Sequence, residues 1–234
     1  METKYYQTEH YIVSNMDEFS DQPKPLERLK EYLNDIENIF PFIEEIFDRK
    51  WNDSDAKIEI RLKKEGKSEY KYNPDNKLDF DNKNHPHIIK FKINNGNIKN
   101  TESGCPKKNL WGCLFHETHH AFLQEMDGRA INKNYKEMFI CVSMATTYLK
   151  LKEEGRICQC RYDDFLSQLK TVISHNKNEG AMELFNEYFS LFDKVSIFTK
   201  FISDLRSSNS VFTDQNNFQQ DLENFKSKIK TDNF

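Results

Sequence analysis

The sequence predicts an α+β fold, in which a small N-terminal sheet packs on one helix and a mostly helical part follows. Two segments, AKIEIRL at 56–62 and IIKFKIN at 88–94, alternate apolar and polar residues with the period of a β-strand. After Cys105, apolar residues recur instead at helical spacing almost to the last residues. The period therefore changes near Gly104, between a strand-containing part (1–104) and a helical part (105–234).

The strand-containing part should also hold a helix. Residues 5–14 are rich in aromatic and β-branched side chains and predict a first strand. In the stretch that follows, Pro25 is tolerated near a helix start, whereas Pro41 should kink or split the helix. The apolar residues at helical spacing are Leu26, Leu29, Leu33, Ile36, Ile39 and Phe40.

Six helices are predicted in the helical part. The expected ranges are 106–126, 134–152, 162–174, two pieces between Glu179 and Leu205, and 214–228. The phenylalanines of the two middle pieces are expected in a core or an interface.

The composition excludes several classes of protein. A net charge of −4 and a pI near 6.0 leave no basic footprint for nucleic acid. No run of about 18 apolar residues could span a membrane, and the first residues lack the apolar region of a secretory signal. Five cysteines without regular spacing suggest reduced thiols. We expect a cytoplasmic protein without a nucleic-acid or membrane partner; secretion of a processed form and the oligomeric state are left open.

The stretch LWGCLFHETHHAFLQEMDGR, at 110–129, holds three of the seven histidines. On a helix, His116 and His120 differ by about 40° and one turn, so both imidazoles can reach one zinc ion at about 2.0–2.1 Å. Glu117 lies on the same side, where it can touch a metal-bound water without being a ligand. His119 falls between the polar and apolar sides and is assigned no ligand role. The pattern His-Glu-x-x-His predicts a metal site, and the alternative is surface or structural histidines.

The motif HETHH, on a helix that follows a strand, resembles the zincin class of zinc metallopeptidases. Metzincins continue as HExxHxxGxxH. In this sequence Leu123 stands in place of that glycine and Met126 in place of the last histidine. Gluzincins take a glutamate from a following helix instead, and Glu137 lies seventeen residues after His120. The resemblance is therefore to the gluzincin type.

A second resemblance concerns the segment HAFLQEMDGRAINKNYKE, at 120–137. It is similar to the basic secretory protein family of plant and bacterial peptidase-like proteins. That family has a glutamine-containing stretch, a Gly-Arg-Ala-like element and then a third-ligand glutamate at similar spacing. The matching positions here are Gln124, Gly128, Arg129, Ala130 and Glu137. After that glutamate, Met138 and Cys141 replace the family's small and acidic residues.

These resemblances imply a single zincin-like metallopeptidase domain, 1–234, with one zinc ion as its cofactor. The implied zinc ligands are His116, His120 and Glu137, and Glu117 would act as general base toward a peptide or protein substrate. The strand at 88–94 could present an edge to an extended substrate. The oxyanion-stabilising residue is left open between Tyr135, Tyr148 and His175.

Other functions are left open by the same residues. The chain could be an inactive zincin-like binding protein, a metal-dependent hydrolase of a non-peptide amide, or a helical interaction protein with incidental histidines. Glu137 could be a first-turn glutamate favoured by the helix dipole, with Glu183 as the reserve ligand. The remaining expectations are packing for Cys113 and Cys141, free thiols at Cys158 and Cys160, and solvent exposure for His85 and His87.

Overall fold

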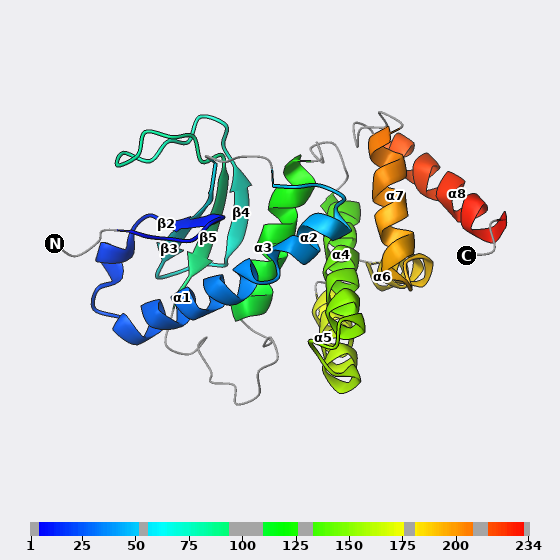
Figure 1. The fold of residues 1–234 in the computed structure, drawn as a ribbon, viewed down its shortest axis with the longest axis horizontal. Helices are drawn as coiled ribbons and strands as arrows, with labels where there is room; N and C mark the ends of the chain where they lie inside the picture. Colours follow the sequence, from blue (N-terminus) through cyan, green and yellow to red (C-terminus); the bar gives the residue numbers. More distant parts are fainter. Residues whose placement is uncertain are drawn as a thin grey trace. The chain divides into compact units, whose positions relative to one another are not determined.

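The structure, a computed structural model, describes residues 5–51, 56–93, 110–125, 133–175, 181–207 and 215–231. Within these ranges it is an α+β fold, as predicted, with one five-stranded sheet and eight α-helices (Figure 1). The chain forms two compact units, Met1–Pro41 with Trp51–Ala121, and Phe42–Lys50 with Phe122–Phe234. The boundary between them falls after Ala121, beyond the change of period near Gly104. That both units act as one functional domain stays a prediction.

The first unit contains the sheet, whose strand order is β1-β2-β3-β5-β4. β2, β3 and β5 are parallel, while β1 and β4 pair antiparallel with β2 and β5 at the two ends. The strands are β1 (Tyr6–Gln7), β2 (Tyr11–Val13), β3 (Ile58–Lys63), β4 (Glu69–Tyr72) and β5 (His87–Lys92). A parallel pair needs a long connection, and helix α1 (Pro23–Glu37) lies in the connection between β2 and β3.

Two predictions about the strands are wrong. Residues 5–14 form a hairpin rather than one strand, because the chain turns between β1 and β2, where the Thr8 N–H donates to the Tyr11 carbonyl (2.9 Å). The segment 88–94 does not present an edge, because β5 lies between β3 and β4. The edge beside it belongs to β4, which the sequence did not predict.

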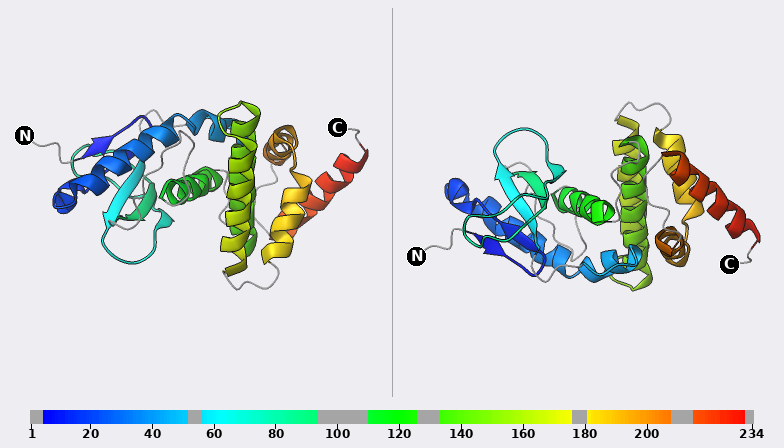
Figure 2. Two further views of the ribbon diagram at one scale, coloured as in Figure 1. Left: turned by 90° about the horizontal axis from the view of Figure 1, so that it is seen from below. Right: turned by 90° about the horizontal axis from the view of Figure 1, so that it is seen from above.

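One face of the sheet is apolar. The register aligns β2, β3 and β5 so that alternate residues share this face. Its buried members are Tyr11, Val13, Ile58, Ile60, Leu62, Ile89 and Phe91. Helix α3 (Leu110–Glu125) packs there, since the Tyr11 hydroxyl reaches the Thr118 hydroxyl at 2.8 Å. Both views in Figure 2 show α3 beside the sheet.

The predicted break at Pro41 is confirmed. α1 buries the expected stripe of Leu26, Leu29, Leu33 and Ile36 and ends at Glu37. The next helix, α2 (Phe40–Ile46), has Pro41 as its second residue, where proline is tolerated because an N-terminal N–H has no intrahelical partner.

The second unit is helical in its described residues. Its helices are α4 (Lys133–Glu153), α5 (Gln159–His175), α6 (Ala181–Leu191), α7 (Val195–Ser207) and α8 (Gln215–Thr231). α4 contacts α5, α6 and α7, and Phe192 lies at the centre of an aromatic cluster with Phe198, Phe201 and Phe225. Phe192, Phe198 and Phe201 are buried, in agreement with the core or interface role expected for the phenylalanines of the two middle pieces. Of the described helices, none is both long and apolar enough to cross a membrane.

Candidate metal site on helix α3

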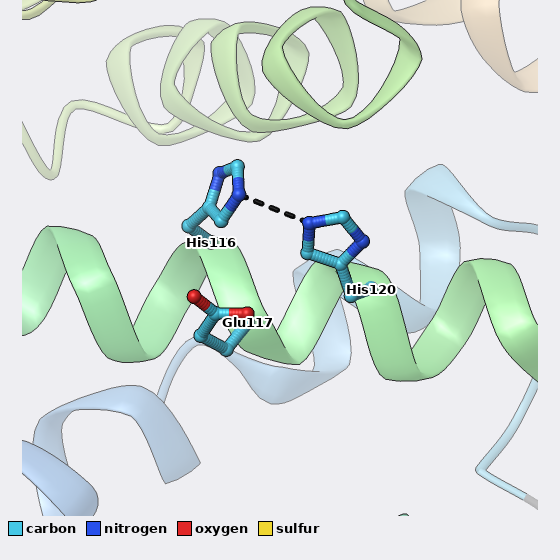
Figure 3. Close-up of side chains that lie close together, drawn as sticks. All are labelled: His116, Glu117 and His120. Atoms are coloured by element: carbon cyan, nitrogen blue, oxygen red, sulfur yellow. Dashed lines mark hydrogen bonds between the residues drawn. The ribbon is translucent and has the colours of Figure 1, made fainter. Parts of the chain in front are cut away.

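The histidines of HETHH come together on one side of α3. The Nε2 atoms of His116 and His120 lie 3.0 Å apart, and the two rings meet at 76° with centroids 4.7 Å apart. Figure 3 shows both imidazoles above the same side of the helix, one turn apart. This follows from the helical repeat, which places residues four apart on one side.

The distance between these nitrogens fits a shared cation. Zinc binds imidazole nitrogen at about 2.0–2.1 Å, so two ligands of a tetrahedral ion are roughly 3.3 Å apart. The 3.0 Å separation of the His116 and His120 nitrogens is close to that value. Both nitrogens face the same point, where a divalent ion could bind to the two of them. The donor set therefore fits zinc or a similar divalent ion.

Glu117 completes the group. One ligand atom from each of His116, Glu117 and His120 lies within 4.8 Å of the others. The Glu117 side chain is buried, with 7% of its surface exposed, and Figure 3 shows its carboxylate on the adjacent side of the helix. A buried carboxylate beside two imidazoles is suited to holding a proton from a water molecule at this position.

His119 points into the core, in agreement with its predicted lack of a ligand role. Its ring Nδ1 donates to the Phe115 carbonyl at 2.7 Å, and its ring packs edge-on against the Phe115 ring. Burial lowers the pKa of His119 to about 3, so the imidazole is neutral.

Hydrogen bonds connect helix α3 to the sheet at Thr118, a residue within the HETHH motif. The Thr118 hydroxyl donates to the Leu114 carbonyl (2.8 Å), which leaves its oxygen to accept from the Tyr11 hydroxyl (2.8 Å). Burial raises the pKa of Tyr11 well above its usual value, which keeps this hydroxyl protonated as a donor. A chain of two buried hydrogen bonds thus sets the position of α3 relative to β2.

One residue for which the sequence predicted no role, Tyr70, lies beside His120, and His87 contacts Tyr70. Tyr70 of β4 places its ring parallel to the His120 ring, with centroids 6.0 Å apart and 7° between the planes. The Tyr70 hydroxyl shares a hydrogen bond of 2.7 Å with Nδ1 of His87, the first residue of β5. The alternating aromatic residues of EYKY, at 69–72, are the only sequence signal for this strand.

The predicted solvent exposure of His85 and His87 is wrong, because both side chains are only 1% exposed. His87 packs among aromatic rings, including that of Trp51. His85 shares a hydrogen bond with Asp81 (2.8 Å) and accepts one from the Lys57 N–H (3.2 Å). Partners from other strands and loops bury these rings, and the local pattern does not show them.

The remaining predicted site residues belong to the second unit or lie outside the described ranges. Glu137 is half-buried in the first turns of α4, and its role as the third ligand stays a prediction. The exposed Glu183 lies in the first turn of α6. Gly128, Arg129 and Ala130, from the family resemblance, lie outside the described residues.

The candidates for oxyanion stabilisation also belong to the second unit. Tyr135 is half-buried, with its ring 6.3 Å from that of Tyr188. Tyr148 is buried and stacks on Phe165 at 3.7 Å, and burial raises the pKa of its hydroxyl. His175 ends α5, and its side chain is outside the described part of the chain. Its role, like those of both tyrosines, stays a prediction.

Four of the cysteines lie in the described ranges, and none of the four belongs to the group of His116, Glu117 and His120. Cys141 is buried and Cys113 half-buried, which agrees with the packing role expected for both. Burial raises the pKa of the Cys113 thiol to about 11. Cys158 and Cys160 are exposed free thiols, as predicted.

A second group of histidine and carboxylates lies in the same unit. It consists of Glu9, His10 and Glu37, which we name the hairpin group because the first two lie in the turn between β1 and β2. His10 Nδ1 is 2.6 Å from one Glu37 oxygen, and the His10 backbone N–H donates to the other at 2.8 Å. The Thr8 hydroxyl also donates to Glu37. This carboxylate is already satisfied by donors of the chain itself.

Compared with protein families, with curated proteins and with solved structures, the chain matches none of them. The interpretation of the site therefore depends on the sequence motif and the geometry of α3.

Proposed function

We propose that this protein is a zinc-dependent metallopeptidase that hydrolyses peptide bonds in a peptide or protein substrate. One observation carries the proposal: two imidazole nitrogens 3.0 Å apart on one side of α3, with the buried Glu117 carboxylate beside them. An i, i+4 histidine pair with an intervening glutamate is the arrangement that metal-assisted hydrolysis uses.

In this proposal His116 and His120 hold the metal through Nε2, and Glu137 is the third ligand. When bound, zinc supplies Lewis acidity: it lowers the pKa of a coordinated water toward about 7 and polarises a substrate carbonyl. Glu117 accepts the proton of the attacking water on a carboxylate oxygen and then passes it to the departing amine nitrogen.

The free side of β4 offers a place for an extended substrate. β4 ends the sheet, and among the described residues β5 is its sole strand partner. A peptide can add to such an edge through backbone hydrogen bonds. Tyr70, on this strand, has its ring next to that of His120, so a peptide on β4 would lie near the histidines.

The test is the Glu117→Gln variant, assayed for zinc content and for hydrolysis of a denatured protein. We expect the variant to keep its zinc and to lose hydrolysis by at least about 100-fold, the range that general-base catalysis contributes. Loss of zinc would show that Glu117 is a ligand, and unchanged hydrolysis would remove it from the mechanism.

The same assay separates the alternatives. Wild-type protein that binds zinc but cleaves no denatured protein would be an inactive binding protein or a hydrolase of another amide. A panel of acylated amino acids, tested with wild type and Glu117→Gln, then distinguishes these two. Wild-type protein that binds no metal would leave the histidines as incidental residues of an interaction protein.

A further inference from the structure

We propose that Tyr70 is a positioning residue for the His120 imidazole and that His87 holds Tyr70 in place. The consequence of this arrangement for metal binding rests on the proposed function. The arrangement itself is a feature of the first unit and can be tested without metal.

The ring of Tyr70 restricts the ring of His120. The two planes are within 7° of parallel and their centroids are 6.0 Å apart, which is within the range of an offset-stacked pair. His120 is 6% exposed, so its ring has little room to turn. Rotation about the Cβ–Cγ bond of His120 would tilt the imidazole out of this stack and move Nε2 away from His116.

Tyr70 is itself fixed from two sides. Its backbone pairs with Ile89 in the ladder between β4 and β5. Its hydroxyl shares the 2.7 Å hydrogen bond with Nδ1 of His87, which is almost fully buried. The His87 ring in turn packs against Trp51, with centroids 5.0 Å apart, and the Trp51 indole N–H donates to the Ala56 carbonyl. A row of buried and half-buried rings therefore connects Trp51, through His87 and Tyr70, to His120.

This support matters because a histidine pair on a helix does not hold its own rings. Neighbouring groups that orient a metal-binding imidazole reduce the freedom it loses on binding, and their removal typically costs about 10- to 100-fold in metal affinity. Tyr70 acts through its ring and needs no bond to the metal. It is thus distinct from the predicted oxyanion-stabilising residues.

The test uses Tyr70→Leu and Tyr70→Phe, with Tyr72→Phe as the matched control. Tyr72 lies on the same strand and its ring touches His87, yet its hydroxyl is not part of the row described above. The first measurement needs no metal: side-chain NMR resonances of the His120 and His87 imidazoles in each variant. The second is affinity for zinc alone, by competition with a chelator, together with the visible spectrum of the cobalt-substituted protein.

We expect Tyr70→Leu to shift the His120 ring resonances, to weaken zinc affinity by about 10-fold and to alter the cobalt spectrum. Tyr70→Phe keeps the ring and loses the bond to His87, so it should shift the His87 resonances and weaken zinc affinity by a smaller factor. Tyr72→Phe should leave zinc affinity, the cobalt spectrum and the His120 resonances unchanged.

Unchanged His120 resonances in Tyr70→Leu would overturn the proposal, whatever the metal affinity. If Tyr70→Leu loses its far-ultraviolet helicity, Tyr70→Phe decides, and unchanged resonances of both imidazoles in that variant would overturn the roles of both residues. If wild type binds no zinc while His120 still shifts in Tyr70→Leu, the positioning stands and the proposed function fails.

Discussion

The α3 motif and the hairpin group contain the same kinds of residue, histidine and glutamate, with opposite arrangements. On α3 two imidazole nitrogens face each other, so both could bind the same cation. In the hairpin group, the His10 ring faces the Glu37 carboxylate, which also accepts from the His10 N–H and the Thr8 hydroxyl. The two groups therefore share their types of ligand and differ in how the ligand atoms are arranged, so ligand type alone does not make a cation site.

The charges and hydrogen bonds around the hairpin group also disfavour a bound cation. Burial raises the pKa of Glu37, but hydrogen bonds from His10 and Thr8 outweigh it and leave the pKa below its ordinary value. The Lys57 ammonium is close enough to interact with Glu37 and Glu9 and donates to the Glu9 carbonyl at 3.0 Å. A cation entering this group would have to displace bonds that are already made.

The largest expected effect is the loss of zinc when the histidines of the α3 motif are removed. Wild-type protein purified without a chelator should contain about one zinc per chain, and His116→Ala with His120→Ala together should contain none. The matched control is His10→Ala, which removes a histidine from the hairpin group and should keep the zinc. Mass spectrometry measures the metal content of each variant. Stoichiometric zinc in the double variant, or loss of zinc in His10→Ala, would refute the assignment of His116 and His120 as zinc ligands.

The next effect concerns Glu137, the proposed third ligand. A catalytic zinc normally has three protein ligands and a water. We expect Glu137→Ala to weaken zinc affinity at least 10-fold, or about 1.4 kcal/mol, with far-ultraviolet helicity retained. Zinc competition titrations should include Glu183→Ala and Cys141→Ala. If either of these weakens binding while Glu137→Ala does not, the third ligand has been misassigned.

A smaller effect is expected on stability at the hairpin group. Glu37→Gln removes the charge that His10 and Thr8 stabilise and should lower the free energy of unfolding at pH 7 by about 1–2 kcal/mol, without affecting zinc affinity. The exposed Glu9, changed to Gln, is the control and should alter stability by less than about 0.5 kcal/mol.

The stabilisation that Glu37 contributes should decrease as the pH falls. The folded-state pKa of Glu37 lies below its unfolded value, so its stabilisation is complete above the unfolded pKa. It is lost as pH falls through the folded pKa. In urea titrations, the difference between wild type and Glu37→Gln should therefore shrink between about pH 5 and pH 3. A difference that stays constant over this range would contradict the argument.

The smallest effect on metal binding should come from the thiols. The Cys160 thiol and the Arg161 N–H, through hydrogen bonds, lower the pKa of exposed Cys158, whereas burial raises that of Cys141. Iodoacetamide near pH 7.5 should modify Cys158 fastest and Cys141 slowest, with zinc content unchanged. Peptide mass spectrometry gives the rates, and fast labelling of Cys141 would show that its burial is not maintained.

The sequence was sufficient where a feature depends on residues close together in the chain. The side-by-side imidazoles of His116 and His120 follow from helical geometry alone. The break at Pro41 also follows from a local cause, the missing proline N–H. These predictions needed no knowledge of which segments meet in the folded chain.

The sequence was insufficient where pairing between distant segments decides the structure. The strand at 69–72 is mostly exposed, so it lacks the buried alternation that identified β3 and β5. Its pairing with β5 determines which strand is the edge and brings Tyr70 to His120. The burial of His87 has the same origin, because rings from Trp51 and β4 cover it.

Within the described part of the chain, β4 is an edge strand, and this bears on self-association. An exposed edge strand can pair with the same strand of another copy and so begin an aggregate, and short length and charged side chains are the usual protection. β4 has four residues, and two of them, Glu69 and Lys71, are exposed and oppositely charged. Replacing both by threonine would keep the strand and remove its charges, which should make the protein prone to concentration-dependent aggregation. The charges of Glu69 and Lys71 should thus help to keep concentrated solutions of the protein free of aggregates that begin at this strand.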